Sequence, residues 1–170
     1  MDRHPYDIKI ELNMNDKERS EVVLHLKKTL SDAYVLFTKL FKFHWNVEGP
    51  FFGPLHSLFQ GLYEQNFKTV DLVAERIRAL GHKAPGTLKE FLDMTRLEET
   101  PGVNPQDCYM LEEIFHDLQK IIMQLRDDEK KIEKLNDRVT SNMLLGIIEQ
   151  HEKSAWMVRS HLEKNEDTKK

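Results

Sequence analysis

The sequence predicts an all-α protein in which four long helices form an up-and-down bundle. Apolar residues recur at intervals of three and four along the chain, which is the spacing of one face of a helix. The prolines stand between or at the start of four long stretches rather than inside them. Hydrophobic residues make up 39% of the 170 residues and charged residues 32%, a balance that suits one folded domain and is too charged for a membrane protein.

The first two helices are expected over about residues 16–46 and 54–80, joined by the turn-forming segment GPFFGP. The apolar stripe of the first consists of Val23, Leu26, Leu30, Ala33, Tyr34, Phe37, Leu40 and Phe41. The stripe of the second consists of Leu55, Leu58, Phe59, Leu62, Val70, Val73, Ala74, Ile77 and Leu80. Gly81 stands where a glycine in the left-handed conformation ends a helix. Both stripes are wide enough to face the core of a bundle.

A connection of about 24 residues follows, from Gly81 to Pro105, with a short helix expected over about 87–93. A third long helix is expected from Pro105, which suits a first helical turn, to about residue 134. The fourth is expected over about 138–164. Because the connection is long enough to span the bundle from end to end, the predicted topology is that of a ferritin-like bundle with one long crossover that carries a short helix.

Composition and the N-terminal sequence exclude several classes of protein. The single cysteine, Cys108, rules out an internal disulfide and a cysteine-based zinc or iron–sulfur site. No run approaches the ~20 apolar residues of a membrane span, and the N-terminus has no apolar signal region, so a cytoplasmic protein without a membrane partner is expected. The net charge of −4 argues against a surface devoted to nucleic acid.

The second helix carries polar and aromatic residues on an arc away from its apolar stripe. At about 100° per residue, this arc holds His56, Gln60, Phe67, Asp71 and Glu75. Tyr63 lies on or beside the arc, and two large aromatic side chains are unusual on a solvated face. This helix is therefore expected to be buried on two sides, by its own bundle and by a partner subunit.

Asp71 and Glu75 form a candidate metal-binding pair. They stand four residues apart, so their carboxylates project side by side. Two like charges at a buried interface are unfavourable unless cations neutralise them. Carboxylate oxygens together with the imidazole nitrogens of His44, which falls in the stripe of the first helix, and His56 suit Fe(II), Mn(II) or Zn(II). The alternative for any one of these residues is a solvated helix position that binds nothing.

Two other histidines are weaker candidates. Glu113 and His116 have the Glu-x-x-His spacing of single-chain di-iron bundles. Both are predicted to face away from the apolar stripe of their helix, so an iron site within one chain is not expected. His151 falls within the stripe of the fourth helix, where no acid accompanies it. A structural histidine held by hydrogen bonds is the favoured interpretation of that position.

Three runs of the sequence resemble the Dps family of mini-ferritins, DNA-binding proteins from starved cells. These runs are FHWNVEGPFFGPLHSLF, DLVAERIRALG and EQHEKSAWMVRSHL, and the similarity extends over about residues 24–162. The resemblance divides the chain into an N-terminal extension at 1–15, a ferritin-like Dps domain at 16–164 and a C-terminal tail at 165–170. It implies a homo-oligomer, a hollow dodecamer.

The resemblance also implies an activity and a site. Members of the family oxidise Fe(II), typically with hydrogen peroxide, and store the ferric product as a mineral in the shell, which protects DNA from oxidative damage. Their iron site lies between two subunits. Carried over by position, the catalytic and metal-binding residues of this ferroxidase would be His44 and His56 of one chain and Asp71 and Glu75 of the other. Iron is the metal so implied, and zinc is a candidate at the resting site.

The chain departs from the family pattern at two positions. The acid usual four residues after the second histidine is Gln60 here, whose amide can offer an oxygen but no charge, which should weaken the second iron position. The acid usual two residues after the first threonine of the last helix, near a threefold pore, is Asn142, beyond Thr140. Nearby Asp137 is expected to supply some attraction for cations. Trp45 corresponds to an aromatic residue near the family's site, with interface packing as the alternative role.

DNA binding, the other activity in the family's name, is not expected. It often depends on a lysine-rich terminal extension that contacts phosphates. Here the first 21 residues carry six acidic and four basic side chains, and the last eight carry three of each. Two alternatives to a ferroxidase stay open: a non-catalytic shell that binds DNA or another partner through its outer surface, and a structural helical oligomer whose site is impaired by Gln60.

Overall fold

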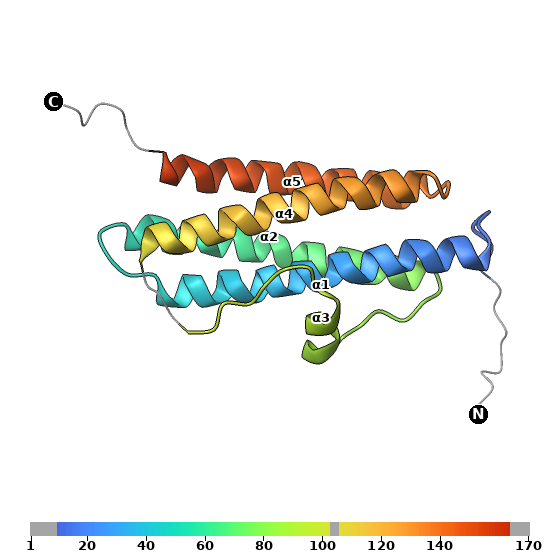
Figure 1. The fold of residues 1–170 in the computed structure, drawn as a ribbon, viewed down its shortest axis with the longest axis horizontal. Coiled ribbons are helices and arrows are strands. Elements are labelled where there is room, and N and C mark those ends of the chain that lie inside the picture. The colour runs from blue at the N-terminus through green and yellow to red at the C-terminus, as the bar shows by residue number, and fades with distance from the viewer. Residues whose placement is uncertain (1–9, 103–105, 164–170) are drawn as a thin grey trace.

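The long helices lie side by side and form a four-helix bundle (Figure 1). The structure is a computed structural model that describes residues 10–102 and 106–163. Its helices are α1 (Asp16–Asn46), α2 (Phe52–Ala79), the short α3 (Leu88–Met94), α4 (Asp107–Glu133) and α5 (Arg138–Leu162). The two described ranges contain helices and no strand, so the predicted all-α class is confirmed.

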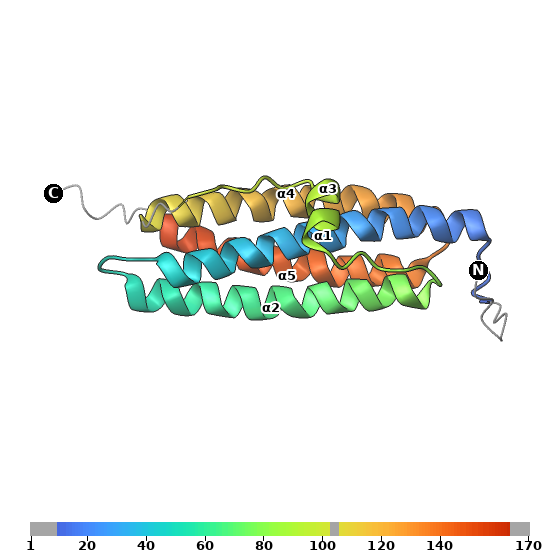
Figure 2. The same ribbon diagram turned by 90° about the horizontal axis from the view of Figure 1, so that it is seen from below.

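The topology is up-and-down with one long crossover. α1 packs most extensively against the antiparallel α2, and α4 against the antiparallel α5, whereas α2 and α5 contact each other much less. The crossover leaves the end of α2 and returns along the α1–α4 side of the bundle, where α3 rests on α1 (Figures 1 and 2). The predicted ferritin-like topology is thus confirmed.

Local hydrogen bonds explain where α1 and α3 begin. Asn15 caps α1: its side chain accepts a bond of 3.0 Å from the backbone N–H of Glu18, and the Glu18 carboxylate accepts one of 2.8 Å in return. Thr87 and Glu90 form the same reciprocal cap at α3. α2 starts at Phe52, two residues before its predicted start. The predicted helix start at Pro105 and helix end at Lys164, like residues 1–9 and the C-terminal tail, lie outside the described residues.

The predicted apolar stripes form the core with one correction. Large side chains from all the long helices are fully buried, among them Leu26, Leu40, Phe59, Ile77, Ile114 and Val158. Phe37 and Phe41, which were expected in the core, are only half-buried. Their rings pack against Tyr63 and Phe67 of α2 instead. No helix in the described ranges is both long and apolar enough to cross a membrane.

The end of α2 offers a test of the backbone geometry. Gly81 has a φ of +87°, as predicted for a left-handed cap, and a Cβ there would lie 2.4 Å from Cδ1 of Ile10. Gly81→Ala should therefore destabilise the chain by about 1 kcal/mol or more. In Gly146→Ala, by contrast, the added methyl group enters open space within α5 and should stabilise the helix by up to about 1 kcal/mol. Thermal unfolding should show midpoints that move in opposite directions, and equal shifts would contradict the left-handed cap.

Candidate metal centre

His44 and His56 face each other at one end of the bundle. His44 lies in the last turn of α1, and His56 lies near the start of α2, across the short connection at 47–51. Their rings are stacked, with centroids 3.7 Å apart and planes inclined by 23°. Two of the four predicted ligands are thus brought together within one chain.

Reciprocal hydrogen bonds orient both rings. Nδ1 of His44 donates to the carbonyl oxygen of His56 at 2.9 Å, and Nδ1 of His56 donates to the carbonyl oxygen of His44 at 2.8 Å. Because a carbonyl oxygen only accepts, each Nδ1 must carry the proton, and a neutral ring then keeps its lone pair on Nε2. The His44 carbonyl is free for this bond because it lies in the last turn of a helix. The pair therefore offers two Nε2 atoms, already oriented, as metal ligands.

Aromatic side chains surround the histidine pair and continue as an exposed patch. Tyr63 meets the His44 ring edge-on at 5.3 Å, and Phe52 stacks on His56 at 5.0 Å. We call the adjoining surface the aromatic patch; it consists of Phe37, Phe41, Trp45, Tyr63 and Phe67. Trp45 is 67% exposed and Phe67 is 56% exposed. Such a group of exposed rings is typical of a surface that another protein chain covers.

Asp71 and Glu75 lie further along α2, away from the histidines. A rise of 1.5 Å per residue places Asp71 about 22 Å from His56 along the helix. Both carboxylates are exposed, and neither is paired with a cation in the part of the chain that the structure describes. In the same ranges, no three His, Cys, Asp or Glu side chains are close enough to hold a metal ion together. One chain therefore supplies the histidines at one end of α2 and the acids more than halfway along it.

Gln60 lies one turn beyond His56 and is oriented by a neighbouring acid. Its Nε2 donates to Oε1 of Glu64 at 2.8 Å, and both side chains are exposed. A carboxylate can only accept, so the amide nitrogen must face Glu64. The Gln60 oxygen is then turned away from Glu64.

Comparison with known proteins identifies the family. A family model described as a ferritin-like domain matches residues 23–167. Over 142 residues the chain is 38% identical to DNA protection during starvation protein 2 of Bacillus anthracis, covering 84% of this chain and 97% of that protein. The chain belongs to the Dps family. It is also 35% identical over 156 residues to a low temperature-induced protein of Nostoc sp., covering 91% of this chain and 87% of that one.

Solved structures agree with this assignment. The crystal structure of Dps from Staphylococcus aureus matches with a TM-score of 0.81 and 33% identity, covering 89% of this chain and 99% of that chain. The resemblance predicted from the sequence is therefore confirmed for the family and for the fold.

Glu113 was predicted to face outward, but the structure places it in a largely buried position. Its side chain is only 14% exposed and forms an ion pair of 2.8 Å with Nζ of Lys39, and it also accepts a bond from the Thr100 hydroxyl. Burial raises the pKa of Glu113, but Lys39 and Thr100 outweigh burial and hold the pKa below its ordinary value. His116 is exposed. In this Dps chain, Glu113 thus forms an ion pair with a buried lysine.

His151 is buried, as predicted, with 3% of its surface exposed. No described residue forms a hydrogen bond with its ring. The hydrogen-bonding partner that was expected for His151 is therefore not found among the described residues.

Asp137 is not the surface charge that was expected near a pore. Its side chain is buried and accepts bonds of 2.9 and 3.1 Å from Nη2 of Arg76. It also caps α5, accepting from the backbone N–H of Thr140 at 3.0 Å. The arginine therefore offsets this charge, and Asn142, which is exposed, adds none.

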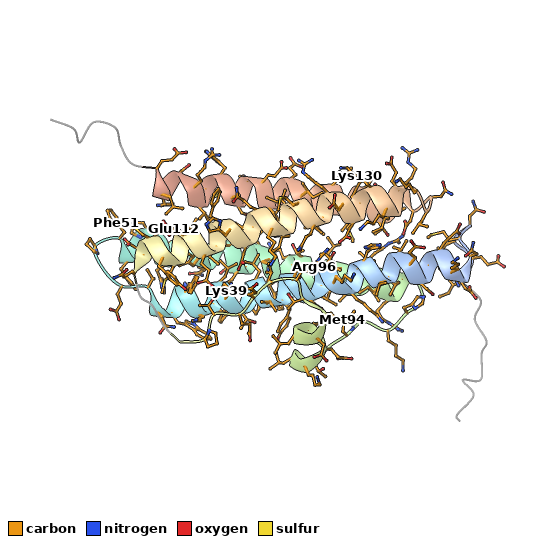
Figure 3. The ribbon with its side chains drawn as sticks, viewed as in Figure 1. Lys39, Phe51, Met94, Arg96, Glu112 and Lys130 are labelled. Carbon is orange, nitrogen blue, oxygen red and sulfur yellow. The ribbon has the colours of Figure 1, made fainter. Side chains whose placement is uncertain are left out.

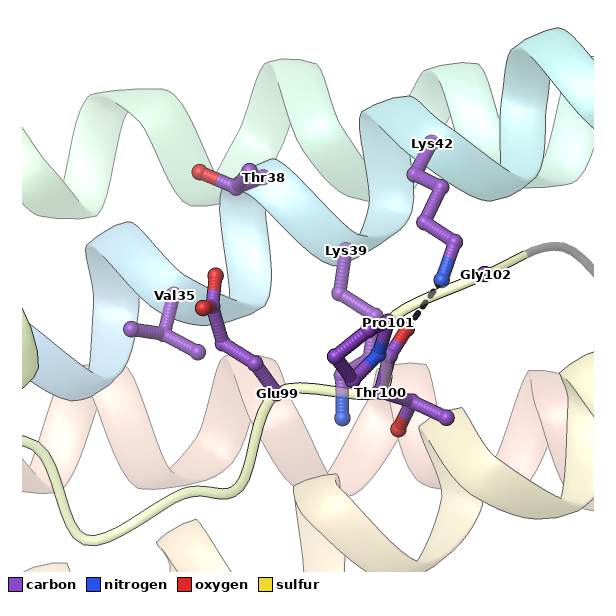
Figure 4. A pocket seen from close by; sticks show the side chains of 8 residues that line it. All are labelled: Val35, Thr38, Lys39, Lys42, Glu99, Thr100, Pro101 and Gly102. Carbon is purple, nitrogen blue, oxygen red and sulfur yellow. Dashed lines mark hydrogen bonds between the residues drawn. The ribbon is translucent and has the colours of Figure 1, made fainter.

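A group of buried charges beneath the crossover was not predicted from the sequence. Nζ of Lys39 donates to Asp117 at 2.6 Å and to the carbonyl oxygen of Glu98 at 2.9 Å, and pairs with Glu113. The three N–H groups of the ammonium thus have three acceptors. Lys42 lies about one turn beyond Lys39 on α1 and donates to the Thr100 carbonyl. It also lines a cavity of about 390 Å³ under the crossover (Figure 4).

A second group of charges ties the crossover to two helices. Arg96, labelled with Lys39 in Figure 3, donates through Nε to Asp32 of α1 at 2.8 Å and through Nη1 to Asp128 of α4 at 2.6 Å. Asp128 also bonds to Nδ1 of His25 at 2.7 Å. The available signal was position: Lys39 and Asp128 both occupy sites in the apolar stripes of their helices, where a charge needs a partner.

Proposed function

We propose that this Dps-family chain forms a shell of paired subunits that oxidises Fe(II) with hydrogen peroxide and stores the ferric product inside. The observation that carries the proposal is the separation of the candidate ligands within one chain. His44 of α1 and His56 of α2 present two oriented nitrogens at one end of the bundle, and the two carboxylates of α2 lie about 22 Å away. Two chains paired about a twofold axis, with antiparallel α2 helices, would join the histidines of each chain to the acids of the other.

The position of the aromatic patch supports this pairing. If His56 faces Asp71 and Glu75 of the other chain, the twofold axis must cross α2 at the midpoint between them, which falls between Tyr63 and Asn66. Phe67, which is 56% exposed, lies directly beside that midpoint. The apolar surface available for burial is thus centred where the proposed ligand set requires the two chains to meet.

The proposed ligands suit iron as a substrate. His44 and His56 would supply imidazole nitrogens, and Asp71 and Glu75 of the other chain would supply carboxylate oxygens whose charges balance the cations. Reducing one hydrogen peroxide to two water molecules takes two electrons and two protons, so two Fe(II) ions are oxidised for each peroxide. Holding both ions in one site favours this reaction over the one-electron reaction that releases hydroxyl radical.

Gln60 would give the second ion a weaker position than the first. Its amide oxygen, turned away from Glu64, can coordinate a cation but adds no negative charge. We therefore propose sequential binding, with the first ion held by the histidines and the acids, and zinc as an alternative occupant at rest. Trp45 would be covered by the partner subunit.

The names of the relatives suggest the biological role. The protein of Bacillus anthracis is named for DNA protection during starvation. Removal of Fe(II) and peroxide together would suppress hydroxyl-radical damage to DNA without a need to bind it. We propose this role in the oxidative stress response for the present chain.

An anaerobic Fe(II) titration followed by a peroxide pulse tests the function. Iron should bind in a saturable way at neutral pH, and the pulse should consume about one peroxide for every two Fe(II) without radical formation in a spin-trapping assay. His116→Ala, which changes an exposed histidine of α4, is the matched control and should behave as wild type. Oxidation no faster than in buffer alone would leave a non-catalytic shell as the better account.

The assembly can be tested separately from the chemistry. Sedimentation should give a particle of about twelve times 20.1 kDa. Phe67→Glu should release smaller species, because it places a charge in the centre of the apolar contact. Phe67→Leu keeps the site apolar and should preserve the particle. A stable wild-type monomer at micromolar concentration would contradict both the pairing and the proposed site.

The shell should not retard duplex DNA in ~0.15 M salt, where screening is already substantial. With a net charge of −4 per chain, few phosphates can be neutralised and few counterions released. An electrophoretic mobility assay at neutral pH checks this. A clear shift would reveal a basic surface on the assembled particle.

A further inference from the structure

A small cavity lies at the centre of the bundle, where all four long helices meet. Its volume is about 10 Å³. It is lined by Leu36 and Leu40 of α1, Leu62, Gln65 and Asn66 of α2, Ile114 and Leu118 of α4, and Gln150, His151 and Ser154 of α5. The α1 and α4 sides are apolar, and the polar groups come from α2 and α5.

Asn66 has an unpaired oxygen at this cavity. The side chain is 2% exposed, and its Nδ2 donates to the carbonyl oxygen of Ala33 at 2.5 Å. Its Oδ1 is buried and has no hydrogen-bond partner among the residues that the structure describes. An amide oxygen left unpaired in a protein interior is destabilising, because it has lost its hydrogen bonds to water and gained none. A native core of this kind normally supplies such an atom with a partner.

His151 faces the same cavity from α5. Burial lowers the pKa of its imidazole to about 4, so the ring is neutral at physiological pH. A neutral imidazole has one N–H donor and one lone-pair acceptor, and both need partners when the ring is buried. The described residues of the chain supply neither.

We propose that one water molecule occupies this cavity and bridges Asn66 and His151. The water donates one hydrogen bond to Oδ1 of Asn66 and makes a second bond to a ring nitrogen of His151. The cavity is about the size of one water molecule, and buried waters typically make two to four bonds to groups that otherwise lack partners. The hydroxyl oxygen of Ser154, whose proton goes to the Gln150 carbonyl at 3.0 Å, offers a third.

The lining selects water over a metal ion. Ferritin-like proteins that hold metal in the bundle core do so with inward-facing glutamates as well as histidines. Every side chain around this cavity is neutral, so a divalent cation there would lose its hydration without a balancing charge. The site is thus polar enough to hold water and has no charge to hold iron.

The bridge would join α2 and α5, which contact each other much less than α1 contacts α2 or α4 contacts α5. A direct hydrogen bond between α2 and α5 runs from Nε2 of Gln150 to Oγ1 of Thr69 at 3.2 Å, one turn from Asn66. A water between Asn66 and His151 extends this polar contact by one turn of α2 and to the next residue of α5. It therefore fixes the register of α5 against α2, which apolar contacts alone specify weakly.

A crystal structure of the wild-type protein at a resolution that shows ordered waters tests the proposal directly. We expect one peak in every subunit, about 2.7–3.2 Å from Asn66 Oδ1 and from a ring nitrogen of His151. An empty cavity would overturn the proposal. So would an anomalous scattering signal that identifies a metal ion.

Substitutions give a second measurement. Asn66→Leu and His151→Phe should each lower the thermal midpoint, because each leaves the other polar group without its bridge. The double variant should lose less than the sum of the two single losses, since no polar group is then left unpaired. His116→Phe, which changes an exposed ring on α4, should leave the midpoint unchanged. Additive losses would contradict a shared water.

Discussion

Shells of His44→Ala and shells of Asp71→Ala should each oxidise Fe(II) at about a tenth of the wild-type rate or less, yet a shell assembled from both chains should recover about a quarter of the wild-type activity. The single losses follow because replacing even a residue that only orients a metal ligand typically costs about 10–100-fold in metal affinity or activity, and removing the ligand itself should cost at least as much. The recovery follows from the proposed sharing of each site between two chains.

The expected recovery can be derived from random pairing. About half of the pairs contain one chain of each kind, and each such pair has two sites. One site has lost both His44 and Asp71. The other takes its histidines from the Asp71→Ala chain and its acids from the His44→Ala chain, so its ligand set is complete. About a quarter of all sites are therefore intact, whereas a site within one chain could never be restored.

The measurement needs proof that the chains have mixed. Two affinity tags, one on each chain, allow mixed shells to be purified before Fe(II) oxidation is followed. The matched control is a mixture of His44→Ala with Asp127→Ala, which changes an exposed acid of α4. Both chains then carry intact Asp71 and Glu75, and the Asp127→Ala chain also carries intact histidines. More of the sites are complete, so this mixture should be more active. Verified mixed shells of His44→Ala and Asp71→Ala that stay inactive would contradict the intersubunit site.

The long helices of this fold could be predicted from the sequence because the apolar period is a local signal. The bounds of α1 follow from its apolar period and from the Asn15–Glu18 cap, and the end of α2 follows from Gly81. Phe37 and Phe41 were misplaced for a physical reason. Periodicity reports that a side chain is apolar and on one arc, but it does not distinguish a core from a face that a second chain covers.

The site was predictable in part. The arc of α2 that carries His56, Asp71 and Glu75 is visible from spacing alone. The orientation of the rings is not, because the bonds from Nδ1 to the carbonyl oxygens depend on how the 47–51 connection aligns two helix ends. The buried charges around Arg96 were missed because their partners lie 32 and 64 residues away in the sequence.

Those buried charges should have the largest effect on stability. Arg96→Met removes the guanidinium that pairs with two carboxylates, Asp32 and Asp128, which are 2% and 5% exposed, and leaves Asp128 only its bond to His25. Breaking a buried ion pair from one side typically costs about 3–5 kcal/mol, because the remaining charge is neither solvated nor paired. At about 2–4 °C per kcal/mol for a chain of this size, the thermal midpoint should fall by roughly 10 °C. Arg126→Met breaks the pair with Glu152, whose side chains are 55% and 46% exposed, and should cost no more than about 1 kcal/mol.

The pH dependence of the difference in thermal midpoint between wild type and Arg96→Met identifies the cause of the lost stability. Burial raises the pKa of Asp32, with Arg96 opposing the shift, so removing the arginine should raise that pKa further. At neutral pH the variant must then bury an unpaired charge. As the pH falls toward the pKa of the carboxyl group, protonation removes that charge and wild type loses the ion pair, so the two midpoints should converge. If the loss came only from the packing of the arginine stem, the gap between the two midpoints would stay constant across the same pH range.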